Sequence, residues 1–190
     1  MSYVPVGTVM RFPTETFEVL ANPETITDRY RVRVTAPPGG GPGVKGDGPH
    51  THPGFVEDFT VISGQMTARV GKDLFEMGPG DRTAVPAGVV HGFVNSGVEL
   101  LEIDVDIVYT PPGPREKADA TLFARIIAGL IEDGHATRRG YPPTPQVALL
   151  LKDRFPEAMS QPGLGGLLMA PLAAWGRLRG MRTVFPEYEN

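Results

Sequence analysis

At 190 residues, of which 41% are hydrophobic and 21% charged, the chain has the size and composition of one globular core with an appendage, too short for two full domains. Its formal charge of −4 gives no general attraction to nucleic acid, so a polyanion-binding role is disfavoured. Because the sequence has no cysteine, disulfides, thiolate metal sites and a cysteine nucleophile are excluded, and any metal must be held by nitrogen and oxygen atoms.

Neither an export signal nor a membrane span is expected. Residues 1–12 lack a basic patch followed by an apolar run of signal-peptide length. The longest weakly apolar stretch, residues 164–175, is short and interrupted by glycine and proline, so no membrane span is predicted. We therefore expect a cytoplasmic protein.

The first part of the chain, up to about Tyr109, has the pattern of β-structure. Short runs rich in valine, threonine, phenylalanine and isoleucine alternate there with glycine and proline turns. Many short strands with regular turns are typical of a sandwich or a barrel, because closing a sheet removes its exposed edges. The predicted strands cover residues 4–11, 15–21, 28–36, 55–63, 65–70, 73–77, 82–86, 90–95 and 98–109.

Two segments rich in proline and glycine divide the chain. Residues 37–48 are too dense in both to form a strand or helix and are predicted to be a loop, either a connector or a rim over a site. Pro111, Pro112 and Pro114 end the last strand. We therefore expect a barrel domain over residues 1–112 and a helical extension over residues 113–190.

The extension has a helical pattern. Apolar residues recur at spacings of three and four at Leu122, Phe123, Ile126, Ile127, Leu130 and Ile131, which predicts a helix that stops near Gly134. Further helices are expected over residues 145–154 and 164–178, with Gly180 as a C-cap. The last is the least regular, because Gly165, Gly166, Pro171 and Gly176 disfavour a helix.

The extension has too many apolar residues for a disordered tail and too few for a core of its own. It should therefore pack on the barrel or on a second subunit and bury Phe123, Ile127, Leu130, Ile131 and Trp175. A homodimer in which it contributes contacts is the expectation. A DNA-binding role for the helices is disfavoured, since they carry little net positive charge and are broken by proline and glycine.

One set of residues has the pattern of a metal site. His50 and His52 are two residues apart, so on a strand both imidazoles face the same side. Glu57 has the opposite parity, but Pro53 and Gly54 can reset the register through a turn or bulge. His91 comes from a distant segment that only a folded sheet brings beside the first.

These residues fall in two motifs. From His50 to Gly64 the chain reads His, one residue, His, four residues, Glu, six residues, Gly, which resembles the first motif of the cupin superfamily. From Gly80 to Asn95 it reads Gly, five residues, Pro, one residue, Gly, two residues, His, three residues, Asn, which resembles the second. The leading glycine of the first motif falls on Val44 here, a position that binds no metal.

The resemblance implies an all-β fold, a double-stranded β-helix or jelly-roll barrel, followed here by a short C-terminal α-helical extension. It also implies that His50, His52, Glu57 and His91 bind a divalent metal. Nitrogen and oxygen ligands suit Fe, Mn, Ni, Co, Cu or Zn and do not select among them.

The cupin resemblance implies several kinds of chemistry, and the fold alone does not choose one. The leading hypothesis is an oxygenase, resembling the dioxygenases of this superfamily, that acts on a small organic molecule chelated to the metal. One alternative is a non-redox isomerase or lyase in which the metal polarises a carbonyl and Glu57 acts as the catalytic base, with Tyr30 or Tyr109 as further candidates. The other is a protein that binds a small molecule without turnover.

Strand parity also predicts the neighbours of the site. Phe59 and Val61 share the parity of Glu57, and Phe93 shares that of His91, so these three should line the cavity. Asn95 is a candidate for orienting a ligand from outside the metal's own contacts. In residues 101–109 the acids alternate with apolar residues and are expected to face solvent.

Overall fold

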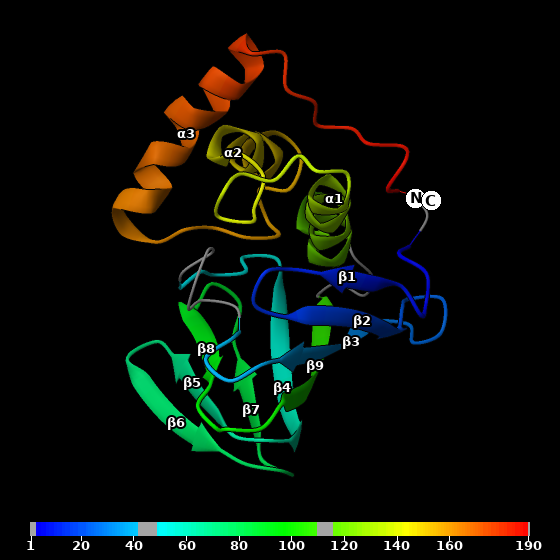
Figure 1. The fold of residues 1–190 in the computed structure, drawn as a ribbon, viewed down its shortest axis with the longest axis vertical. Coiled ribbons are helices and arrows are strands. Elements are labelled where there is room, and N and C mark those ends of the chain that lie inside the picture. The colour runs from blue at the N-terminus through cyan, green and yellow to red at the C-terminus, as the bar shows by residue number, and fades with distance from the viewer. Residues whose placement is uncertain (1–2, 42–48, 110–115, 190) are drawn as a thin grey trace.

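A computed structural model describes residues 3–41, 49–109 and 116–189. Its β-strands form one end of the molecule and its α-helices lie together at the other (Figure 1). The strands are β1 (Val9–Arg11), β2 (Thr16–Ala21), β3 (Arg29–Ala36), β4 (Phe55–Ser63), β5 (Met66–Val70), β6 (Asp73–Met77), β7 (Arg82–Val85), β8 (His91–Asn95) and β9 (Leu101–Tyr109). Each strand overlaps a predicted strand, and its ends differ from the predicted ends by at most five residues. The agreement arises because alternation and turn residues mark strands locally.

The strands form two antiparallel sheets, as the prediction of an all-β barrel requires. A six-stranded sheet has the order β1-β2-β3-β9-β4-β7, and a three-stranded sheet has the order β6-β5-β8. Strands β1, β2 and β3 pair in chain order, whereas β9 pairs with β3 and β4, which lie far from it in sequence. This topology, together with the helices, confirms the all-β fold class with a helical extension.

Strand β9 shows why the six-stranded sheet has one inner and one outer face. Its residues alternate between buried and half-buried along the whole strand, as predicted. On the outer face, Asp106 pairs with Arg31 at 2.7 Å and Asp104 pairs with Arg33 at 2.8 Å. Opposite charges therefore meet across β3 and β9 on the side that faces solvent.

The helices are a short 3₁₀ turn, η1 (Glu116–Ala118), and α1 (Ala120–Glu132), α2 (Thr144–Asp153) and α3 (Gly163–Leu178). The Asp119 side chain caps α1 by accepting a hydrogen bond from the backbone N–H of Leu122 at 2.9 Å. Helix α3 runs through Pro171 without a break. It packs on α2 at Gly176, where a Cβ would lie 2.8 Å from the Pro145 carbonyl oxygen, so glycine permits this close approach.

The extension and the barrel share one hydrophobic core. Buried side chains of the extension, including Phe123, Ile126 and Phe155, belong to the same cluster as Met10 and Tyr30 of the barrel. The helices thus close one end of the barrel (Figure 1). The predicted boundary at residue 112 falls within residues 110–115, outside the described part of the chain.

The expected burial of the extension is right for most residues and wrong for one. Phe123, Ile127 and Leu130 are buried and Ile131 is half-buried. Trp175 is 49% exposed, with the Arg179 guanidinium 4.5 Å from its ring centre. The reason is that α3 turns the face bearing Ala173 and Gly176 toward α2, which leaves the indole on the outside.

Two other expectations concern the loop at residues 37–48 and a possible membrane span. Most of the predicted loop at residues 37–48 lies outside the described residues, which omit 42–48. No helix in the described part of the chain is long and apolar enough to cross a bilayer.

Candidate metal centre

The segment that carries His50 and His52 is held on both sides. His50 pairs with His91 at the start of β8 through two backbone hydrogen bonds of 3.1 and 2.9 Å. Thr51 pairs with Ser160 of the extension through two more, of 2.9 and 2.8 Å. The barrel and the extension therefore both fix the backbone of this segment.

The turn at Pro53 and Gly54 brings Glu57 back to the histidines. Gly54 donates its N–H to the Glu157 carbonyl at 3.0 Å, and a Cβ on Gly54 would lie 2.7 Å from that of Ala118. Strand β4 starts after this turn, and its Glu57 has one carboxylate oxygen, Oε2, 2.9 Å from His91 Nε2 and the other, Oε1, 3.6 Å from His52 Nε2. The predicted turn thus brings the acid to the histidines.

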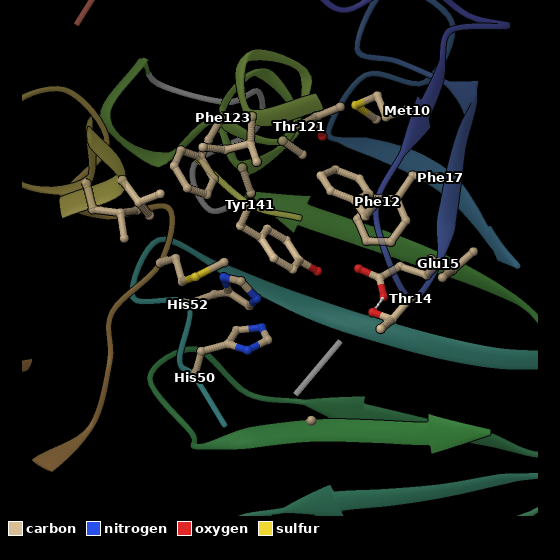
Figure 2. Close-up of a pocket in the computed structure, with 18 of the residues that line it drawn as sticks. Met10, Phe12, Thr14, Glu15, Phe17, His50, His52, Thr121, Phe123 and Tyr141 are labelled. Atoms are coloured by element: carbon tan, nitrogen blue, oxygen red, sulfur yellow. Dashed lines mark hydrogen bonds between the residues drawn. The ribbon is translucent and has the colours of Figure 1, made fainter. Parts of the chain in front are cut away.

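The three histidines converge. One ring nitrogen of each of His50, His52 and His91 can be chosen so that all three atoms lie within 4.8 Å of one another, and all three residues are buried. Figure 2 shows the rings of His50 and His52 side by side at the edge of the cavity. Three buried histidines so placed suggest a site for a divalent metal.

The outer nitrogens of two rings are engaged by backbone carbonyls. Nδ1 of His91 lies 2.9 Å from the Val89 carbonyl oxygen, and Nδ1 of His52 contacts that of Ala158 in the extension. A carbonyl only accepts, so each ring donates from Nδ1 and keeps a lone pair on Nε2. Both lone pairs are then available to a metal, in the tautomer that outer hydrogen bonds commonly impose on ligating histidines.

The contacts of His91 Nε2 bear on whether a metal fits this group. His91 Nε2 is buried and has no hydrogen-bond partner in the described part of the chain, although the Glu57 carboxylate is 2.9 Å away. With Nδ1 as the donor, a neutral His91 ring turns a lone pair on Nε2 toward the lone pairs of the carboxylate, and either a proton on Nε2 or a cation bound by both groups makes the contact favourable. The residues present therefore fit a bound divalent metal.

The pKa values of Glu57, His52 and His91 are shifted by burial and by the attraction between these groups. Burial alone raises the pKa of Glu57, but attraction to His52 and His91 outweighs it and lowers the pKa to about 2. Burial lowers the pKa of His52, an effect larger than the opposing attraction of Glu57. Burial also acts to lower the pKa of His91, but the adjacent Glu57 carboxylate outweighs it, so this pKa is raised.

Metal affinity should fall in acid, because a proton on His91 Nε2 competes with the metal. A pKa at the usual 6.5 would already weaken apparent binding about thirtyfold at pH 5 relative to pH 8, and the raised pKa makes the loss larger. The measurement is a metal titration of chelator-treated protein at several pH values. Equal affinity at pH 5 and pH 8 would contradict histidine ligation.

The stability of the metal-free fold also depends on pH, through the pKa values of His91, Glu57 and His52. The raised pKa of His91 stabilises the metal-free fold below the unfolded value near 6.5, and this contribution disappears only as the pH rises through the folded pKa. The lowered pKa of Glu57 stabilises the fold above the unfolded value near 4.5 and is lost only as the pH falls toward 2. Between pH 5 and pH 8, neither change weakens the metal-free fold toward acid. The lowered pKa of His52 does weaken it as the pH falls below about 6.5, so circular dichroism at each pH is needed to show that the protein is still folded.

A cavity of about 750 Å³ lies beside the histidines, between the barrel and the extension. His50, His52, Glu57 and His91 contribute to its lining. The rest is mainly apolar, with Phe12, Phe17, Phe59, Phe93, Phe123 and Met169 among the larger side chains. This volume is that of a site for a small organic ligand, and the apolar walls would exclude water from it.

The predicted neighbours of the site are only partly right. Phe59 and Phe93 line the cavity, whereas Val61 is buried in the core outside the described lining. The side-chain amide of Asn95 donates to the Ala36 and Glu99 carbonyls at 2.9 and 2.8 Å, so it holds a turn.

The two tyrosines considered as bases lie away from the described cavity lining. Tyr30 is fully buried in the core, and its hydroxyl accepts a hydrogen bond from the Val4 N–H at 2.9 Å. Tyr109 is buried against Phe55, with ring centres 5.4 Å apart. Burial raises the pKa of both phenols, which makes them poor proton acceptors near neutral pH.

Sequence reasoning missed most of the polar residues that line the cavity, among them Glu15 and Tyr141. Glu15 lies between β1 and β2, and Tyr141 lies between α1 and α2 (Figure 2). Neither belongs to a motif or to a periodic apolar pattern. Only the packing of the extension over the barrel brings them together.

Comparison with known proteins identifies the barrel. Residues 32–113 match the family model described as the Cupin domain. This region is a cupin domain, so the resemblance indicated by the two motifs is confirmed. A search of curated proteins gave no match.

Several solved structures are similar to this chain. A predicted oxalate decarboxylase from Thermotoga maritima is 23% identical, with 50% of this chain and 80% of the other covered and a TM-score of 0.45. An uncharacterised protein with a double-stranded β-helix domain from Klebsiella pneumoniae is 25% identical, with 53% and 82% covered and a TM-score of 0.44. The polyketide cyclase RemF from Streptomyces resistomycificus is 24% identical, with 57% and 79% covered and a TM-score of 0.43.

Proposed function

We propose that this protein is a metal-dependent oxygenase that acts on a small organic molecule. The observation that supports it best is the group of three histidines and Glu57 beside a largely apolar cavity of about 750 Å³. In the proposal, His50, His52, Glu57 and His91 hold one divalent ion. Four protein ligands leave positions on a six-coordinate metal for other molecules, which distinguishes catalytic from structural sites.

When bound, a redox-active divalent metal would supply Lewis acidity and a route for electrons between an organic substrate and dioxygen. The other contributions come from the chain. The Ala158 and Val89 carbonyls keep the two rings turned with Nε2 toward the site. Phe59 and Phe93, whose ring centres are 5.8 Å apart, pack beside the histidines and exclude water from that end of the cavity.

Glu57 contributes as a ligand in this proposal. Its pKa of about 2 makes the carboxylate a weak proton acceptor near neutral pH, so a role as catalytic base would require it to leave the metal and its histidine neighbours. Its charge instead offsets part of the charge of a divalent ion in a buried setting.

A non-redox isomerase or lyase is the second candidate. It is favoured by the carboxylate of Glu15, which lies on the cavity wall. In this candidate Glu15, and not the metal ligand Glu57, takes a proton from the substrate. Binding without turnover is the third. A homodimer and the absence of nucleic-acid partners also remain proposals that rest on the sequence.

The oxygenase proposal predicts that oxygen consumption requires both metal and an organic substrate. Protein freed of metal is reconstituted separately with each divalent ion and screened with aromatic and aliphatic acids, phenols and diketones in an oxygen electrode. Uptake should occur with one reduced metal and one substrate class, and His50→Ala should lower the rate at least a hundredfold, because losing a ligand displaces the metal.

His135, the fourth histidine, is exposed after α1 and provides the matched control. His135→Ala should keep the full rate of oxygen uptake. Turnover of a substrate under strict anaerobiosis, with no other oxidant present, would reject the oxygenase proposal and favour the isomerase or lyase.

A further inference from the structure

Glu15 is a buried acid on the wall of the cavity. It ends the connection between β1 and β2, where the Phe12 N–H donates to the Glu15 carbonyl at 2.9 Å. Only 5% of the residue is exposed. Its carboxylate accepts a hydrogen bond from the Thr14 hydroxyl, and both residues line the cavity (Figure 2).

Apolar side chains make up much of the cavity wall near this carboxylate. The rings of Phe12 and Phe17 pack together beside it, with centres 5.0 Å apart, and Met10 is fully buried nearby (Figure 2). Burying a carboxylate in such a wall is unfavourable unless polar groups contact it. The Thr14 hydroxyl is one such contact, and it lies in the same turn as Glu15.

A tyrosine of the extension completes the polar group. Figure 2 shows the hydroxyl of Tyr141 and the carboxylate of Glu15 pointing toward one another inside the cavity, apart from the rings of His50 and His52. Tyr141 comes from the loop between α1 and α2, so this second polar region exists only where the extension covers the barrel. The cavity thus has polar groups at Glu15 and Tyr141 as well as beside the histidines, with apolar side chains between them. Other polar side chains, among them Thr121, Thr137 and Arg139, also line it.

We propose that Glu15, together with Thr14 and Tyr141, forms a second binding region that selects ligands by a hydrogen-bond donor. The ligand class is a largely apolar molecule, aromatic or of similar size, with a carboxylate or other oxygen group at the metal end and a hydroxyl or amine at the Glu15 end. This inference rests on the proposed function, because the metal holds the end of the ligand that carries the carboxylate or other oxygen group. Glu15 touches the ligand and sets specificity.

The selectivity follows from the cost of desolvation. A ligand that lacks the donor removes water from the Glu15 carboxylate and gives nothing back, whereas a hydroxyl or ammonium forms a charge-assisted hydrogen bond in a setting of low dielectric constant. Hydrogen bonds to charged groups of this kind change affinity by about tenfold to a hundredfold. Tyr141 can donate to the same carboxylate and orient it toward the ligand.

Two pairs of probes that differ by one hydroxyl test this. The pairs are benzoate with 4-hydroxybenzoate and 2-naphthoate with 6-hydroxy-2-naphthoate. The two hydroxylated acids place the hydroxyl donor at two different distances from their own carboxylate. Binding to the zinc-loaded and the metal-free full-length protein is measured by calorimetry. We expect at least one hydroxylated acid to bind about ten to a hundred times more tightly than its parent, and only when metal is present.

Variants assign the preference to Glu15. In Glu15→Ala the hydroxylated acid should lose its advantage while its parent binds unchanged or better, and Glu15→Gln should be intermediate, because a neutral amide is a weaker acceptor. Glu18→Gln is the matched control, since Glu18 is exposed on the neighbouring strand β2. It should keep the full preference.

The outcomes separate the two proposals. If acids bind in a metal-dependent way but neither hydroxylated acid gains over its parent, or the gain survives in Glu15→Ala, the Glu15 inference is wrong and the metal site stands. If no acid binds in a metal-dependent way, the proposed function fails, and the inference that rests on it fails too.

Discussion

Replacing His91 with alanine should abolish most metal binding and the stabilisation that metal provides. A ligand present at about 100 to 1,000 times its dissociation constant stabilises a native state by about 3–4 kcal/mol, because it binds the folded protein alone. For a chain of this size that corresponds to a rise in Tm of roughly 5–15 °C. In His91→Ala this rise should shrink to a few degrees, since the Nε2 atom nearest Glu57 is gone.

The measurement is the difference in Tm between metal-loaded and chelator-treated protein, made within each variant. This comparison cancels any change in packing caused by the substitution itself. His135→Ala should keep the whole metal-dependent rise, because His135 is exposed and far along the chain from the motifs. Full metal occupancy by elemental analysis in the double variant His50→Ala/His91→Ala would show that the site is wrongly placed.

Truncating Phe155 should have the largest effect on stability outside the metal site. This side chain is fully buried between α2 and the segment that contacts His52, with its ring centre 5.8 Å from that of Phe123. Removal of a buried phenylalanine ring costs about 3–5 kcal/mol of unfolding free energy, because contacts are lost and a cavity remains. Phe155→Ala should therefore lower Tm by roughly 6–20 °C.

The same variant should also weaken metal binding. Phe155 lies three residues before Ala158, and the Ala158 N–H donates to the Phe155 carbonyl at 3.1 Å, so a shift here moves the carbonyl that orients His52. Losing such an outer hydrogen bond costs about tenfold to a hundredfold in metal affinity. Leu178→Ala, at a position 81% exposed, should change neither property.

A single cooperative unfolding transition in all these variants is expected, because the barrel and the extension share one core. Calorimetry that resolves two transitions in the native chain, with only the first shifted by Phe155→Ala, would show that the extension folds by itself. In that case the metal affinity of the variant should also stay unchanged.

Local patterns in the sequence determined most of the elements. The alternation of Leu101, Ile103 and Val105 with acids predicts β9 and its inner face, and the structure confirms both. The spacing of Leu122, Ile126 and Leu130 predicts α1. These patterns work because the side-chain periods of strands and helices are properties of the backbone.

That the four proposed metal-binding side chains lie close together could also be predicted. His50 and His52 share a face by the two-residue period, and the turn at Pro53 and Gly54 corrects the parity of Glu57. The position of His91 required the family resemblance, because it depends on pairing between strands far apart in the chain.

The rest of the site was decided by tertiary structure alone. The carbonyl that orients His52 belongs to Ala158, a residue with no side-chain chemistry for a pattern to detect. Glu15 and Tyr141 are polar residues in turns, and they line one cavity only because the extension closes the barrel. Trp175 is exposed because close helix packing favours the small residues on the other face of α3. In each case a long-range contact sets the environment, and periodicity along the chain carries no information about such contacts.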